Sequence, residues 1–260
     1  MILIDTHTHL YLPHFKDDLD QVIKNATDYN VVKMLLPNID YSTIGQMLEV
    51  CTQFPAYCHP MLGLHPTSVG EDYVSQLSLI KSAGQNEKFI AIGETGMDAY
   101  WDKSYMSQQE SAFITQIGWA KEMDLPIVIH SRDTMDIVLA ILKTHSDGKL
   151  RGVLHAFSGT ALQADFAVGM GFKIGLGGVI TYKNSGLEPV IEAIDLQNII
   201  LETDSPYLTP VPHRGKRNES ANLVHIVRKI AEVKGITTEE AAATTSRNAI
   251  DLFNLKINNP

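Results

Sequence analysis

The first ten residues place two imidazole side chains and one carboxylate at a spacing suited to binding a divalent metal. Residues 2–10 predict a short buried strand that ends in two histidines. Because side chains two residues apart on a strand point to the same side, Asp5, His7 and His9 share one face. Imidazole nitrogens with a carboxylate behind them are typical ligands of such metals. A His-x-His pair also occurs in proteins without a metal, so the rest of the chain must decide between the two interpretations.

The composition limits the classes of protein to which these residues can belong. The chain has 260 residues, of which 44% are hydrophobic and 20% are charged, and its net charge is −9. These values indicate a globular protein and exclude a disordered one. The negative charge argues against a protein that binds nucleic acid along an extended basic face. An anionic substrate would therefore be attracted locally, by bound cations or by a small basic cluster.

The sequence also carries expectations about the cellular compartment. The two cysteines, Cys51 and Cys58, do not indicate a disulfide framework. No basic segment precedes an apolar one at the N-terminus, and no apolar run approaches ~20 residues. We therefore expect a cytoplasmic protein in a reducing compartment, with no membrane-spanning segment.

Short apolar runs alternate with longer amphipathic stretches along the whole chain. The expected strands lie in 2–10, 31–36, 56–64, 89–93, 126–129, 152–154, 172–176 and 198–201. Helical spacing of apolar residues occurs in 17–29, 42–53, 107–123, 134–144, 161–169, 184–194, 219–234 and 238–253, and less regularly in 71–85. Ser107, with Glu110 three residues later, fits a capping box. Strands that are apolar throughout are typical of a parallel sheet covered by helices.

This alternation predicts a single (β/α)8 TIM barrel over residues 1–260, with a C-terminal helix. The alternative is an open doubly wound sheet. That fold usually has a glycine-rich turn after its first strand, whereas here the first strand ends in histidines. The barrel is therefore the preferred prediction.

In a (β/α)8 barrel the active site lies at the carboxyl ends of the strands, and here most of those ends carry a histidine or a carboxylate. In chain order these residues are His7, His9, His65, Glu94, His130, His155, Glu202 and Asp204. Imidazoles bind one cation each, and a carboxylate can bridge two. Two bridged cations can activate water and hold the oxygens of the displaced group, while another carboxylate accepts the proton of the water.

The motifs around these residues resemble the TatD family of the metal-dependent amidohydrolase superfamily. They are Ile4-Asp5-Thr6-His7-Thr8-His9, Gly93-Glu94-Thr95-Gly96, His130-Ser131-Arg132, His155-Ala156-Phe157-Ser158-Gly159, Leu201-Glu202-Thr203-Asp204-Ser205-Pro206-Tyr207 and Arg214-Gly215-Lys216-Arg217-Asn218-Glu219. They occur in order from residue 4 to residue 219, so the resemblance covers essentially the whole chain. Met97 and Ser220 depart from the usual leucine and proline, and neither is an expected ligand.

The resemblance implies a two-metal hydrolase. One cation would be held by His7, His9, Glu94 and Asp204, and the other by Glu94, His130 and His155, so that Glu94 is the bridge. Members of the family are described as magnesium-dependent deoxyribonucleases. The implied activity is cleavage of phosphodiester bonds at DNA ends, of the 3′-5′ exonuclease type, by attack of a metal-bound hydroxide with Asp204 as the base and Glu94 as a second catalytic residue.

Six further residues are expected to contact the substrate. They are His65, Arg132 and Glu202, which lie near the site in the family, and the basic cluster Arg214, Lys216 and Arg217, which follows the last strand. Barrels often bind phosphate at that position. Simpler interpretations stay open for each group. His65 can shape the turn before Pro66, Glu202 can orient a ligand, and the basic cluster can be a solvated loop.

Two further alternatives concern arginine and aromatic side chains beyond the strand ends. Arg132 can pair with Asp133 or Asp136 at the surface instead of binding an anion. The aromatic residues that follow the strands can stack on bases or simply pack against their neighbours. These aromatic residues are Tyr100, Trp101, Tyr182 and Tyr207.

The leading hypothesis is therefore a hydrolase that acts on single-stranded or frayed DNA ends, with no membrane association and no obligate protein partner. Two rivals stay open: an amidohydrolase that cleaves a small ester, lactone or amide, and a metal-binding protein without catalytic activity. The identity of the two divalent cations is open between Mg²⁺, Mn²⁺ and Zn²⁺. Several histidine ligands favour Zn²⁺ or Mn²⁺, whereas the family resemblance implies Mg²⁺.

Overall fold

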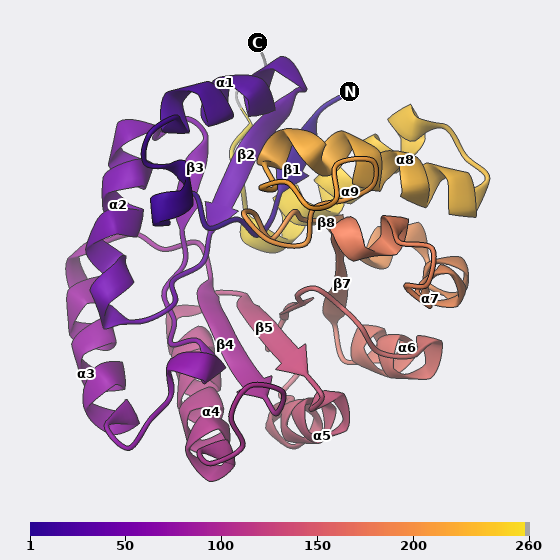
Figure 1. Cartoon of the computed structure of the whole chain (residues 1–260). Helices are drawn as coiled ribbons and strands as arrows, with labels where there is room; N and C mark the ends of the chain where they lie inside the picture. The colour runs from indigo at the N-terminus through magenta and orange to yellow at the C-terminus, as the bar shows by residue number, and fades with distance from the viewer. Residues whose placement is uncertain (258–260) are drawn as a thin grey trace.

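The computed structural model describes residues 1–257, and its strands lie at the centre of the molecule with helices around them (Figure 1). The strands are β1 (Leu3–Asp5), β2 (Val31–Leu36), β3 (Cys58–Pro60), β4 (Ile92–Asp98), β5 (Ile127–Arg132), β6 (Gly152–Leu154), β7 (Phe172–Leu176) and β8 (Ile199–Leu201). The helices are α1 (Leu19–Asp28), α2 (Ile44–Gln53), α3 (Tyr73–Ala83), α4 (Met106–Met123), α5 (Met135–His145), α6 (Ala161–Gly169), α7 (Glu188–Ala193), α8 (Leu223–Lys234) and α9 (Thr238–Phe253).

All paired strands are parallel, and the sheet closes on itself. Pairing runs in chain order from β1 to β3 and from β4 to β8. The seam between β8 and β1 is closed by the N–H of Thr6, which donates to the carbonyl of Leu201 at 3.1 Å. The seam between β3 and β4 is closed by the N–H of Leu62, which donates to the carbonyl of Ala91 at 3.1 Å. The predicted (β/α)8 barrel is confirmed.

The interior of the barrel is apolar at one end, where α9 packs against it. Residues in or directly next to the strands form one buried cluster there with residues in or just after α9: Ile4, Leu35, Met61, Ala91, Val128, Val153, Ile200, Ala249, Leu252, Phe253 and Leu255. A second, larger cluster lies between the strands and the surrounding helices. Burial on both faces explains why the strands are apolar throughout. The expected C-terminal helix therefore has a packing role, and the polar residues gather at the opposite end of the barrel.

Several expected boundaries differ from the structure for local reasons. Helix α4 begins at Met106 after Tyr105, so Ser107 lies in its first turn and does not cap it. A capping box occurs instead at Thr160 and Gln163, at the start of α6. Helix α7 is shorter than expected and begins next to Pro189, a residue that suits a first helical turn. Within residues 1–257, no helix is long and apolar enough to cross a membrane.

Candidate metal centre

Glu94 lies at the centre of the polar cluster, and its two carboxylate oxygens face different histidines. The side chain comes from β4 and is almost fully buried. Its Oε2 atom lies 3.0 Å from His7 Nε2 and 3.7 Å from His9 Nε2. Its Oε1 atom lies between 3.0 and 3.7 Å from one nitrogen of each of three other histidines, His65, His130 and His155. A carboxylate with ligands on both sides is the arrangement expected of a bridge between two cations.

Asp204 approaches the same cluster from the turn after β8. Its Oδ1 atom lies 3.5 Å from His9 Nε2, 3.8 Å from His7 Nε2 and 3.9 Å from His155 Nε2. The backbone of Asp204 is in the left-handed region, with φ of 55°, and its N–H donates to the carbonyl of His7. Aspartate tolerates this conformation better than most residues. The strained turn thus aims the carboxylate back over β1.

These donors fit a divalent cation. Three sets of side chains have ligand atoms within 4.8 Å of one another: His7, His9 and Glu94; His7, His155 and Asp204; and His65, Glu94 and His130. The rings of His7 and His155 stack with centroids 3.4 Å apart. Imidazole nitrogens and carboxylate oxygens are the donor types of Zn²⁺ and Mn²⁺ sites. The structure thus brings together all six expected ligands (His7, His9, Glu94, His130, His155 and Asp204), which we call the candidate metal centre.

Hydrogen bonds on the outer side of the centre fix the orientation of His9. The phenol of Tyr11 donates to the carbonyl of Pro37 at 2.7 Å, and its oxygen lies 2.9 Å from His9 Nδ1. Because the only phenol proton is used on the carbonyl, the phenol oxygen must accept the proton of His9 Nδ1. The lone pair of His9 Nε2 is then directed at Glu94 and Asp204. Tyr11 therefore selects the tautomer that a metal requires.

Carboxylates lie behind two of the other three histidine ligands, His130 and His155. Asp98 Oδ2 lies 2.8 Å from His130 Nε2, so that His130 Nδ1 faces Glu94. Glu202 Oε1 lies 2.9 Å from His155 Nδ1, in an ion pair without the geometry of a linear hydrogen bond, and accepts the N–H of Ala156. A side chain at position 175 would clash with Glu202, because a Cβ on Gly175 would lie 2.6 Å from its Oε2 atom.

His65 has the opposite tautomer. Its Nδ1 accepts the backbone N–H of Thr67 at 3.1 Å, in the turn before the short helix Pro66–Ser68. A neutral His65 therefore carries its proton on Nε2, the nitrogen that lies 3.3 Å from Glu94 Oε1. An Nε2–H is a donor and not a ligand. The geometry thus distinguishes His65 from the six residues of the candidate metal centre.

The electrostatics of the cluster follow from burial and from close pairing. Burial alone would raise the pKa of Glu94, but His65, His7 and the other histidines hold it well below the ordinary value. Burial would lower the pKa of His155, yet Glu202 and Glu94 raise it to about 10. A cation held by His155 would compete with the proton on its imidazole.

The structure directs two of the expected substrate-contact residues, Glu202 and Arg217, towards protein partners. Glu202 is 1% exposed and lies behind His155, so it reaches a ligand and not the opening of the site. Arg217 donates to both carboxylate oxygens of Asp18, at 2.8 and 2.7 Å, and to Glu219 at 2.9 Å. These ion pairs of the guanidinium therefore hold the loop after β8 against the start of α1.

Three other expected substrate contacts, Arg132, Arg214 and Lys216, are exposed to solvent. The Arg132 guanidinium stacks on the ring of Tyr100, 3.7 Å from the centroid. Arg132 pairs with neither Asp133 nor Asp136 in residues 1–257, so that alternative is not supported. The Arg214 guanidinium lies 4.1 Å from the ring centroid of Tyr182, and Lys216 is exposed.

Tyr11 and Thr67 are the residues that sequence reasoning missed. A signal for Tyr11 was available, because it continues the alternation of Asp5, His7 and His9 by one step. Thr67 contacts His65 Nδ1 through its hydroxyl, at 2.6 Å, and through its backbone N–H, at 3.1 Å, and only the folded turn brings these groups together. Asp5, expected on the face of the histidines, is fully buried and accepts from the N–H and hydroxyl of Thr203 at 2.9 and 2.6 Å. It therefore anchors the turn that carries Asp204.

Comparisons with known proteins agree with this geometry. A family model described as TatD related DNase matches residues 4–254. The uncharacterized metal-dependent hydrolase YabD of Bacillus subtilis is 37% identical over 255 residues, covering 98% of this chain and all of that protein. The 3′-5′ ssDNA/RNA exonuclease TatD of Erwinia tasmaniensis is 32% identical over 259 residues, covering 97% of this chain and all of that protein. The crystal structure of YjjV, a TatD homolog from Escherichia coli K12, superimposes with a TM-score of 0.91 at 30% identity over 98% of each chain.

Proposed function

Since this chain belongs to the TatD family of metal-dependent hydrolases, we propose that it removes nucleotides from single-stranded or frayed DNA ends, in the 3′-5′ direction. The observation that carries the proposal is the position of Glu94, whose two oxygens face separate sets of histidines. The name of the Erwinia relative, an exonuclease of single-stranded DNA and RNA, supports the substrate class.

The residues of the candidate metal centre would hold two cations. In this proposal His7, His9 and Asp204 bind on one side of Glu94, and His130 and His155 bind on the other. Bound divalent cations supply positive charge to the phosphoryl oxygens and lower the pKa of water. The protein itself contributes a fixed set of lone pairs, because Tyr11, Asp98 and Glu202 hold the three outer histidines in orientation.

Asp204 is the carboxylate of the centre that is best placed to accept a proton from water. Its side chain is 15% exposed, against 3% for Glu94. Burial would raise the pKa of Asp204, but its contacts with His9, His155 and His7 keep the pKa below the ordinary value. The group is thus ionised at neutral pH and open to solvent, as a general base must be.

His65 would donate a hydrogen bond to the substrate. Its side chain is 13% exposed, and Thr67 keeps the ring proton on Nε2, on the side of Glu94. A donor fixed beside the candidate metal centre can stabilise charge that develops on a phosphoryl oxygen. His65 would then contact the substrate as expected from the sequence, and it could do so because its ring proton is on Nε2.

The proposal is tested with end-labelled oligonucleotides and a panel of small esters, lactones and amides, each with Mg²⁺, Mn²⁺ or Zn²⁺. We expect mononucleotides to be released from the 3′ end of a single strand, and faster than from a blunt duplex. Turnover of small substrates alone would favour the amidohydrolase alternative, and no turnover at all would favour a non-catalytic protein. The matched control is Glu122→Gln, which changes an exposed carboxylate in the last turn of α4 that pairs with Lys81 at 2.7 Å and not with an expected ligand.

A further inference from the structure

The loop after β4 exposes two large aromatic side chains next to the candidate metal centre. Tyr100 is 54% exposed and Trp101 is 70% exposed. Their rings pack edge to face, with centroids 5.1 Å apart and an interplanar angle of 89°. Aromatic surface that is left open to water beside a polar site is typical of a binding surface. We call this pair the aromatic platform.

The aromatic platform is tied to the candidate metal centre through one carboxylate. Asp98 Oδ1 accepts the backbone N–H of Tyr100 at 2.9 Å and that of Trp101 at 3.1 Å. Asp98 Oδ2 lies 2.8 Å from Nε2 of His130, one of the expected ligands. The Asp98 side chain therefore both orients His130 and fixes the turn of the loop. It thereby sets the distance between His130 and the aromatic platform.

Arg132 adds a positive charge to the aromatic platform. Its guanidinium lies 3.7 Å from the ring centroid of Tyr100 and 5.8 Å from that of Trp101. Within the described residues it has no carboxylate at ion-pair distance, although the protein is acidic overall. Stacking occupies the face of the guanidinium and leaves its N–H edge available for a phosphate. Arg132 lies two residues after His130, at the end of β5.

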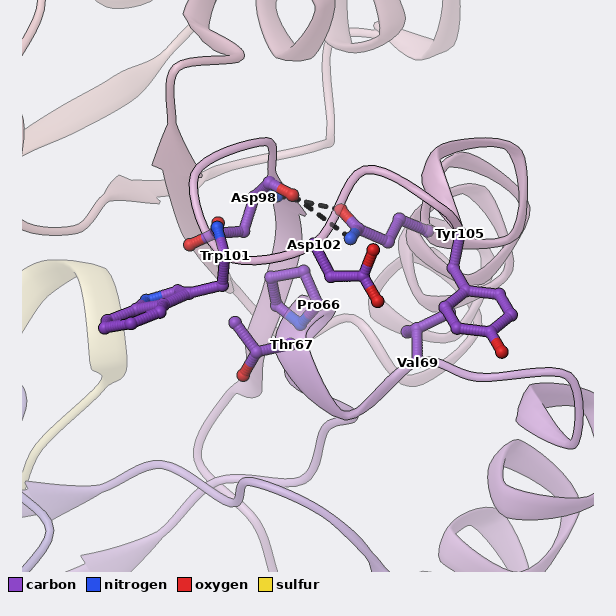
Figure 2. Close-up of a pocket in the computed structure, with 8 residues that line it drawn as sticks. Pro66, Thr67, Val69, Asp98, Trp101, Asp102 and Tyr105 are labelled. Carbon is purple, nitrogen blue, oxygen red and sulfur yellow. Dashed lines mark hydrogen bonds between the residues drawn. The ribbon is translucent and has the colours of Figure 1, made fainter.

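A cavity of about 110 Å³ lies between this loop and the turn that holds His65. Pro66 and Thr67 line one side, and Asp98, Trp101 and Asp102 line the other. Figure 2 shows the indole of Trp101 beside Thr67 and directed away from Tyr105. The two carboxylates make the cavity unfavourable for a phosphate, whereas the indole face and the guanidinium outside it suit a base and a phosphate.

We propose that Tyr100, Trp101 and Arg132 form a nucleotide subsite, in which a base of the strand stacks on the aromatic platform and Arg132 binds a neighbouring phosphate. The inference rests on the proposed function and names how the substrate strand is held. Stacking is tolerant of base identity because every base has a flat aromatic face. The subsite therefore selects an unpaired strand and not a particular sequence.

The two tryptophans of the chain allow a direct test. Trp119 is 5% exposed, so Trp119→Phe leaves Trp101 as the single tryptophan, whose fluorescence can be excited selectively at long wavelength. We expect oligothymidylate to quench this fluorescence in EDTA, where hydrolysis does not occur. An abasic oligomer of the same length and charge should bind about 5- to 150-fold more weakly, the range of one lost base–aromatic stack. Equal binding and quenching by both oligomers would overturn the stacking.

Variants in the otherwise wild-type chain provide a second readout. Trp101→Ala and Arg132→Ala should each raise the KM for oligonucleotide with little change in kcat. Tyr29→Ala is the matched control, because Tyr29 is 53% exposed but precedes β2, at the other end of the barrel. Unchanged KM in both test variants, with DNA hydrolysis intact, would overturn this inference alone. Absence of DNA hydrolysis in the parent would instead overturn the proposed function.

Discussion

Tyr11→Phe removes a single oxygen atom and tests whether the protein sets the tautomer of a metal ligand. Tyr11 is 6% exposed, and its hydroxyl contacts both His9 Nδ1, at 2.9 Å, and the carbonyl of Pro37, at 2.7 Å. Without it, His9 can place its proton on Nε2, the nitrogen that faces Glu94. Loss of such an outer partner lowers metal affinity by about 10- to 100-fold. The buried carbonyl of Pro37 also loses its partner, which lowers the free energy of unfolding by about 1–3 kcal/mol.

The assay is the rate of oligonucleotide hydrolysis as a function of Mn²⁺ concentration. We expect the half-saturating concentration to rise by about one to two orders of magnitude, with kcat largely restored at saturation. Tyr182→Phe is the control, because it removes a hydroxyl that donates to the carbonyl of Thr209 at 3.0 Å without contacting an expected ligand. An unchanged Mn²⁺ requirement in Tyr11→Phe would refute the reasoning. A fall in kcat that no Mn²⁺ concentration restores would place Tyr11 in the chemical step instead.

Three further effects are expected, at Glu202, His155 and His59. Glu202→Gln should weaken metal binding by about 10- to 100-fold but leave the KM for oligonucleotide unchanged at saturating metal, because Glu202 lies behind His155. A raised KM would indicate that Glu202 contacts the substrate after all. Cation binding at pH 8 should release protons, because the pKa of His155 is raised to about 10, and metal affinity should therefore fall as the pH falls. Calorimetry in two buffers of different ionisation enthalpy measures the number of protons released. Zero release would contradict the prediction. Burial and Lys33 lower the pKa of His59 to about 4 in the folded protein. In the unfolded chain His59 binds a proton near pH 6.5, whereas in the folded protein it stays neutral there. The free energy of unfolding therefore falls as the pH drops from 6.5 towards 4. Compared with its effect at pH 7.5, His59→Gln should raise the free energy of unfolding by about 1 kcal/mol at pH 5.5, as measured by urea denaturation. The same pH dependence in the variant and the parent would show that His59 does not cause the loss of stability.

Much of the fold was predictable because local patterns determine it. A buried parallel strand must be apolar on both faces, and the short runs at 31–36 and 172–176 meet that requirement and match β2 and β7 as expected. The boundary of α4 was not predictable in the same way. Ser107 and Glu110 have the types of a capping box, but the chain enters the helix one residue earlier, at Met106. Tyr105 stands at the N-cap and makes no side-chain capping hydrogen bond, so the side-chain types do not mark that entry.

The site separates into parts that residue types reveal and parts that they do not. His7 and His9 share a face because of a spacing of two, and the structure places both beside Glu94. The partner of Arg217 is Asp18, almost two hundred residues earlier in the chain, so the basic cluster looked free in sequence. The tautomer of His65 depends on contacts with the hydroxyl and the backbone N–H of Thr67 in a turn. Such contacts arise only from the folded arrangement.

The central claim is that one carboxylate, Glu94, joins both halves of the candidate metal centre. The most direct measurement is the metal content of Glu94→Gln and of the parent, by plasma mass spectrometry after loading with Mn²⁺ and gel filtration, with Glu122→Gln as control and circular dichroism to verify folding. Because each oxygen of Glu94 faces its own histidines, we expect the parent and the control to retain two equivalents and Glu94→Gln to lose occupancy at both positions. Loss of a single equivalent, with hydrolysis retained, would contradict the account.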